Sequence, residues 1–182
     1  MARSRNCALT EARGRCLIFA DDDIVLDQKG LDAGLAAFAA DPDLVLLLGR
    51  SVDPDGNLRK SYDRQARALT RFNAAKAATF EMMIRTGGVA EARVRFDEGF
   101  GAGAPNHLGD EYIFIADLLR AGCRCVSIPV VFATHPAESS GLRWSARENL
   151  RARVAVFRRV FPRLWPLVVV AFLAKNLTRL RP

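Results

Sequence analysis

A short apolar segment that runs directly into three aspartates constrains the fold of this chain more than any other feature. Leu17 to Ala20 form the apolar segment, and Asp21, Asp22 and Asp23 follow without a break. The segment predicts a buried strand, and in an open α/β sheet the residues after such a strand lie at the edge where ligands bind. Three adjacent negative charges repel one another, and a divalent cation with oxygen ligands removes this repulsion. The pattern therefore predicts a metal site, and the alternative is a solvated acidic turn that caps the helix starting near Lys29.

Helical and extended patterns alternate along the rest of the chain. Apolar residues recur at helical spacing within residues 30–40, and residues 44–48 are a second continuous apolar run. Strand, helix and strand in this order predict a parallel crossover unit and hence an α/β fold. Pro129 predicts that the strand containing it lies at a sheet edge, because proline cannot donate a ladder hydrogen bond. The further predicted elements are helices at 4–12 and 110–121, strands at 80–85 and 123–132, and either a helix or a loop at 59–78.

Basic residues are concentrated at the C-terminal end. The 182 residues carry a net charge of +7, and from Arg143 onward Glu148 is the only acidic residue. Arginines are interleaved there with Trp and Phe, which predicts basic amphipathic helices over residues 142–182. Such helices either lie in a membrane interface or pack on the neighbouring domain. The charge suggests an anionic membrane surface, a nucleic acid or a phosphate-bearing substrate, in that order.

The cysteines, the first residues and the longest apolar stretch of the sequence bear on the cellular location. Four cysteines without a CxxC pair are typical of reduced thiols in a reducing compartment. The first residues do not resemble a signal peptide, and the longest apolar stretch, residues 164–174, is too short to cross a bilayer. We therefore expect a cytoplasmic protein, which would be peripheral at the inner face of the membrane if the C-terminal helices lie in its interface.

A second acidic site lies at the start of the helix predicted over 110–121. Asp110 and Glu111 follow Gly109 and a glycine-rich loop. Acidic residues in a first helical turn are favoured by the helix dipole, so capping is one interpretation. The other is a general base that takes a proton from a substrate hydroxyl, since a helix N-terminus keeps a carboxylate ionised at neutral pH.

Five ordered stretches resemble the inverting family 2 glycosyltransferases, which have the GT-A fold, a Rossmann-like mixed sheet flanked by helices. Four of these stretches contain predicted site residues, and the remaining one is the strand that leads toward the acceptor region. His135-Pro136 also falls where many members of the family place a histidine near the metal or the diphosphate. The matching stretches are Ser4-Arg5-Asn6 with Ala8 ("RN" helix), Ile18 to Asp23 (DxD), Glu81 to Arg85 (strand), Phe96 to Gly101 ("FDE-x-FG") and Gly109 to Tyr112 ("ED").

The resemblance implies transfer of a sugar from a nucleoside-diphosphate sugar to an acceptor hydroxyl, with inversion and with Mg²⁺ or Mn²⁺. The acceptor would be a glycan, a lipid-linked molecule or another hydroxyl compound, and no nucleic acid partner is expected. The implied metal ligands are Asp23, Asp21 and His135. Glu111 is implied as the catalytic base, with Asp110 as the second choice. The residues implied to bind the nucleotide sugar or the acceptor are Arg5, Asn6, Asp21, Asp22, Gly101 and His107.

The resemblance covers roughly residues 2–141. We expect residues 1–141 to form a partial GT-A catalytic domain, followed by basic amphipathic C-terminal helices over 142–182. In the family, a first strand, helix and second strand bind the nucleobase and precede the "RN" helix, so we expect this first part to be missing here. Two alternatives follow: a truncated remnant that binds a partner without catalysis, and a haloacid-dehalogenase-like phosphatase. In the phosphatase, Asp21 would be the nucleophile that attacks a phosphate, and Lys76 would be the lysine of the active site.

Overall fold

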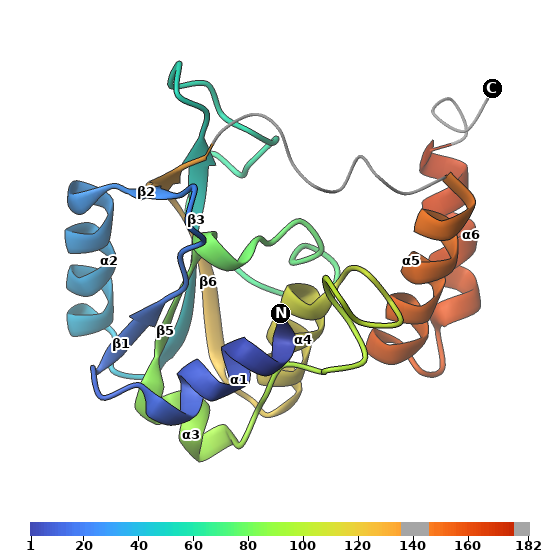
Figure 1. The fold of residues 1–182 in the computed structure, drawn as a ribbon, viewed down its shortest axis with the longest axis horizontal. Helices are drawn as coiled ribbons and strands as arrows, with labels where there is room; N and C mark the ends of the chain where they lie inside the picture. Colours follow the sequence, from blue (N-terminus) through green and yellow to red (C-terminus); the bar gives the residue numbers. More distant parts are fainter. Residues whose placement is uncertain (136–145, 177–182) are drawn as a thin grey trace.

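A mixed β-sheet lies between two layers of helices in the computed structural model, which describes residues 1–135 and 146–176 (Figure 1). The strands are β1 (Cys16–Ile18), β2 (Val25–Leu26), β3 (Leu44–Val52), β4 (Arg67–Ala68), β5 (Met82–Arg85) and β6 (Arg124–Thr134). The helices are α1 (Ala2–Glu11), α2 (Gln28–Ala40), the 3₁₀ turn η1 (Thr79–Glu81), α3 (Thr86–Ala92), α4 (Asp110–Arg120), α5 (Ala146–Val160) and α6 (Trp165–Asn176). The predicted α/β fold with a C-terminal helical segment is confirmed.

The strand order is β1-β5-β3-β6-β2, with β4 paired to β6. β3 runs parallel to β6 and antiparallel to β5, and β5 is in turn antiparallel to β1. β1 and β3 therefore point in the same direction, as the strand–helix–strand pattern predicts. They do not pair with each other, because β5 lies between them. The DxD strand is thus placed by a partner from much later in the chain.

The prediction that Pro129 marks an edge strand is wrong. β6 pairs along one side with β3 and along the other with β4 and β2. Pro129 lies between the part of β6 that pairs with β4 and the part that pairs with β2, and the register with β3 shifts between Ser127 and Val131. A proline at an irregularity removes no ladder hydrogen bond, which is how an interior strand accommodates it.

The start of α2 tests the interpretation that the acidic run caps this helix. Asp27 caps the helix, and its Oδ1 accepts a hydrogen bond from the backbone N–H of Gly30 at 2.6 Å. Asp21, Asp22 and Asp23 lie earlier, in the turn between β1 and β2, where all three are exposed. The run therefore does not cap the helix. The segment 59–78, left open between helix and loop, is a loop that contains only the short strand β4.

The two faces of the sheet carry separate hydrophobic clusters. Phe38 of α2 packs with Leu47, Met83 and Phe132 on one face. The larger cluster, on the other face, is centred on α4, whose Phe114 is completely buried. Val156 and Val160 of α5 belong to this larger cluster, so α5 packs against the domain beyond α4 (Figure 1). No helix in the described ranges is long and apolar enough to cross a membrane.

Candidate functional site

The first half of the candidate site is the turn that carries the three aspartates. Asp23 lies opposite His135, with 3.6 Å between Asp23 Oδ2 and His135 Nε2. His135 directly follows β6 and is buried, and its backbone N–H donates to the Val52 carbonyl at 3.0 Å. The structure thus brings together two of the three predicted metal ligands. They come from distant parts of the chain and meet because β6 ends where β2 begins and β3 ends.

The donor atoms suit a hard divalent cation that is shared with a phosphate group. Asp23 offers a carboxylate, about half exposed, and His135 offers a ring nitrogen. Within residues 1–135 and 146–176, no three His, Cys, Asp or Glu side chains form a closed metal cluster. Mg²⁺ sites commonly use one or two carboxylates and take further ligands from substrate phosphates and water. The two side chains therefore fit a metal that takes its remaining ligands from phosphate and water.

The second half of the site is the acid pair at the start of α4. Arg5 of α1 contacts both members, Asp110 through a short ion pair and Glu111 Oε1 at 3.1 Å. Asp110 is buried beneath Gly101, where an added Cβ would lie 2.5 Å from the Asp110 Cγ. Glu111 is the more accessible of the two, with a fifth of its side chain exposed, and its Oε1 accepts a hydrogen bond from Thr79 Oγ1 at 2.7 Å.

The Arg5 guanidinium contacts both carboxylates, and the pKa values of the two acids shift in opposite directions. Burial and the nearby negative charge of Glu111 raise the pKa of Asp110 to about 7, against the opposing effect of Arg5. Burial alone would also raise the pKa of Glu111, but Arg5, the Thr79 hydroxyl and Asp110 outweigh it and lower that pKa. At neutral pH the accessible Glu111 is therefore ionised, while Asp110 holds a proton for much of the time.

Arg5 and Asn6, both predicted to bind substrate, are buried and join the "RN" helix to the "FDE" loop. The Asn6 side chain exchanges two hydrogen bonds with the backbone of Phe96, at 2.8 and 2.9 Å, and donates a third to Glu98 at 3.1 Å. The Phe96 ring stacks on Phe114 of α4 at 4.2 Å, and the Arg5 guanidinium lies 5.6 Å from its centroid. The contacts observed for Arg5 and Asn6 therefore hold the acid pair and the loop in place.

The remaining predicted residues lie around the acid pair or away from it. Gly101 packs directly against the Asp110 side chain and has φ +93°, a conformation that favours glycine. His107 lies in the same glycine-rich loop, but its Nε2 is 3.1 Å from Asn149 Oδ1 of α5. His107 thus links the loop to the C-terminal helices.

The two halves are connected by η1, which sequence reasoning missed. Thr79 contacts Glu111, and the ring of the next residue, Phe80, lies 5.0 Å from the His135 ring. An unbroken line of contacts therefore runs from Asp23 to the acid pair. In the sequence these residues look like the beginning of a buried strand, and nothing in their spacing marks them as part of a site.

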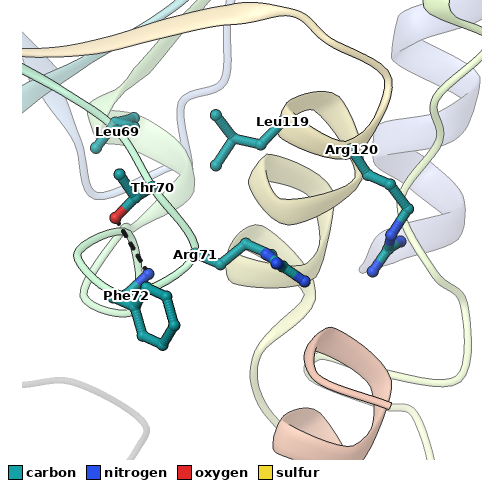
Figure 2. Close-up of a pocket in the computed structure, with 6 residues that line it drawn as sticks. All are labelled: Leu69, Thr70, Arg71, Phe72, Leu119 and Arg120. Carbon is teal, nitrogen blue, oxygen red and sulfur yellow. Dashed lines mark hydrogen bonds between the residues drawn. The ribbon is translucent and has the colours of Figure 1, made fainter. Parts of the chain in front are cut away.

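An open cavity of about 470 Å³ lies at the opposite end of α4 from the acid pair (Figure 2). The Arg71 and Arg120 side chains flank it, and the Thr70 hydroxyl accepts a hydrogen bond from the Phe72 N–H at 3.2 Å. None of the predicted catalytic or metal-binding residues lines this cavity. It is therefore distinct from the candidate site.

Known proteins resemble this chain in sequence family and in fold. The model of glycosyl transferase family 2 matches residues 1–100. No curated protein matches the sequence. Among solved structures, S. aureus TarS 1–349 in complex with UDP-GlcNAc superposes with a TM-score of 0.62 at 16% identity, over 87% of this chain and 46% of that one. The UDP complex of the same protein gives 0.58 at 17% identity, over 87% and 44%.

These matches cover most of this chain but less than half of the solved TarS chains. They establish the GT-A fold predicted from the sequence. They also weigh against the phosphatase alternative, whose expected lysine, Lys76, donates instead to the Ser61 carbonyl at 3.4 Å. Because the family model covers more than half of the sequence, the chain belongs to glycosyl transferase family 2.

Proposed function

We propose that this domain transfers a sugar from a nucleoside-diphosphate sugar to an acceptor hydroxyl, with inversion and with the help of Mg²⁺ or Mn²⁺. The observation that carries the proposal is the line of contacts from Asp23 through His135 and η1 to Glu111. These contacts support the proposal because they join the residues proposed to hold the metal to an ionised carboxylate. The complexes of TarS with UDP-GlcNAc and UDP support a nucleotide-sugar donor.

Each residue then has a defined task. Asp23, Asp21 and His135 would hold the metal, which offsets charge on the departing diphosphate when it is bound. Asp22 lies in the same exposed turn and would bind the nucleotide sugar. Glu111 takes the proton from the acceptor hydroxyl, because it is accessible and its pKa is lowered. Asp110 stays behind Gly101 and, with Arg5, fixes the position of Glu111.

Binding and transfer are tested separately. A thermal shift with UDP or GDP that requires Mn²⁺ is expected for the wild type and for Glu111→Gln, and is expected to disappear in Asp23→Ala. Asp43→Ala, which changes an exposed aspartate at the opposite end of β3 from His135, is the matched control. Glu111→Gln is expected to lose transfer, roughly 100-fold or more, because a general base contributes at least that much.

Three results would contradict this proposal. A shift with phosphate analogues but with no nucleotide would favour phosphate chemistry instead. Wild-type transfer by Glu111→Gln would remove Glu111 from the role of base. Nucleotide binding without turnover in a chain extended at both ends would favour the non-catalytic remnant.

We further propose that α5 and α6 hold the domain at the inner face of an anionic membrane, where a lipid-linked acceptor would be reached. α6 exposes Leu167 and Val170 to 68% and 64%, and Leu164 precedes it at 47%. Exposed arginines of α5, including Arg151 and Arg158, supply positive charge nearby. Apolar side chains flanked by cations are typical of interfacial helices, whereas two such surfaces would repel each other in a dimer.

Vesicle sedimentation tests this surface. The wild type is expected to bind vesicles that contain phosphatidylglycerol and to bind pure phosphatidylcholine weakly. Leu167→Glu with Val170→Glu is expected to abolish binding, whereas Leu35→Glu, an exposed leucine on α2, is the control. Equal binding by both variants would exclude α6 as the contact.

A further inference from the structure

Two of the three consecutive residues of η1 contact the site and the third anchors the turn, although none of the three was predicted to function. Thr79 donates to Glu111 Oε1 at 2.7 Å, and Phe80 packs against His135 at 5.0 Å. Glu81 turns the other way, into the protein beneath the site. All three residues are buried, and only 1% of the surface of Glu81 is exposed. A single short turn therefore touches both halves of the site at once.

Glu81 is held by donors from three separate segments. Its Oε1 accepts from Ser51 Oγ at 2.7 Å and from the Tyr62 hydroxyl at 2.6 Å. Its Oε2 accepts from Lys60 Nζ at 2.8 Å and from the Ala78 N–H at 3.1 Å. The end of β3, the loop at 60–62 and the residue before η1 are thus tied to one carboxylate. Burial and the charge of Glu81 raise the pKa of Tyr62 to about 12, so this tyrosine remains a donor.

Burying the Glu81 carboxylate costs free energy, because the lost hydration must be offset by several good hydrogen bonds. Besides packing, the anchored turn fixes the direction from which Thr79 donates to Glu111. The charged and polar groups in contact with Glu111 are Arg5 from α1, Asp110 from the same helix and Thr79 from η1. Arg5 and Thr79 reach the same oxygen, Oε1, from different elements, which restricts rotation of the carboxylate.

We propose that η1 is the positioning element of the site: Thr79 orients the catalytic carboxylate, Phe80 supports His135, and Glu81 anchors the turn that carries both. This inference rests on the proposed function, because it assigns η1 a part in the chemistry of Glu111 and His135. Thr79 and Glu81 act through other residues and are not themselves catalytic.

The contact is tested first without any enzymatic assay. In ¹³C-labelled protein, the Glu111 carboxyl signal is assigned by its loss in Glu111→Gln and followed through a pH titration. Thr79→Val is expected to move the titration of Glu111 to higher pH, because a hydrogen bond to the charged form is lost. Thr79→Ser is expected to leave it near the wild-type position. Thr86→Val is the matched control, since Thr86 donates to the Gly14 carbonyl at 2.7 Å on another part of the molecule.

The positioning role is tested next, through release of UDP from UDP-GlcNAc in the presence of Mn²⁺. Thr79→Val and Glu81→Gln are each expected to lower kcat roughly 10- to 100-fold with little change in KM, as misplacement of a reacting group does. Thr79→Ser is expected to restore most of kcat. Glu91→Gln, which alters an exposed glutamate on α3, is the control for Glu81→Gln and is expected to behave as the wild type.

The outcomes separate this inference from the proposed function. A titration of Glu111 that is the same in Thr79→Val and Thr86→Val refutes the contact, whatever the activity. A displaced titration with unchanged kcat refutes the positioning role. If no variant and no wild-type protein releases UDP, the proposed function fails, while the titration still decides whether η1 orients Glu111. Should Glu81→Gln fold poorly, the two Thr79 variants decide the question.

Discussion

The shared guanidinium of Arg5 makes a sharp prediction about how stability depends on pH. The pKa of Asp110 is about 7 in the folded chain and 3.8 in its ordinary state, so the protonated form is favoured by folding. A raised carboxyl pKa contributes stability that is fully present below about pH 4 and is lost as the pH rises through about 7. Roughly three pH units at about 1.4 kcal/mol each give a loss of about 4 kcal/mol at most.

The perturbation is Asp110→Asn, which resembles the protonated acid in size and carries no charge. Its free energy of unfolding is expected to lack this fall, so the wild type should lose stability relative to Asp110→Asn between about pH 4 and pH 7. Glu111 does not obscure the effect, because its pKa is lowered and its own contribution changes at more acidic pH. Urea unfolding at a series of pH values measures both proteins. Parallel stability curves over this range would show that Asp110 ionises as in the unfolded chain, and the assignment of charges within the acid pair would be refuted.

Three further changes test the support of the site by urea unfolding. Gly101→Ala is expected to cost about 1–3 kcal/mol more than Gly56→Ala, because both residues have positive φ but only at Gly101 does the new Cβ meet the buried Asp110; equal losses would contradict this. Asn6→Ala is expected to cost about 1–3 kcal/mol, because the buried Phe96 N–H loses its partner, and a loss no larger than that of an exposed asparagine would argue against the contact. Arg159→Met is expected to cost about 1 kcal/mol, and less at high salt, because Arg159 pairs with Asp97 and Asp117 while a third of its side chain remains exposed; a salt-independent loss would point to packing instead.

The local patterns in the sequence predicted most of the fold because each of them records an interaction within one element. The spacing of Leu31, Leu35 and Phe38 identified α2, and the apolar face of 110–121 identified α4. Pro129 misled because a proline reports only that its own N–H is unavailable. Whether the cause is a sheet edge or an irregularity depends on neighbouring strands that a local pattern does not contain.

The candidate site was predictable where acidic residues cluster, and not where it depends on contacts between distant segments. The resemblance implies that Asp23, His135 and Glu111 belong to one site. In the structure Asp23 lies 3.6 Å from His135, and Glu111 accepts a hydrogen bond from Thr79 at 2.7 Å, while the roles of these residues stay predictions. Thr79 carries no such signal, because a lone threonine ahead of an apolar strand is common. Its meaning arises only when the fold brings it beside Glu111, which lies in a helix that begins far along the chain.

The insertion of β5 between β1 and β3 also bears on how the chain acquires its site during synthesis. Leu17 pairs with Ile84, so among the described residues the strand that leads into the aspartates gains its partner only when β5 has been made. Contacts between residues so far apart in the sequence form late and slowly, because the entropy of closing a long loop is lost before the contacts stabilise the chain. A nascent chain that ends before β5 should therefore leave the DxD turn open to proteolysis, and the turn should become protected only after β5 has emerged from the ribosome.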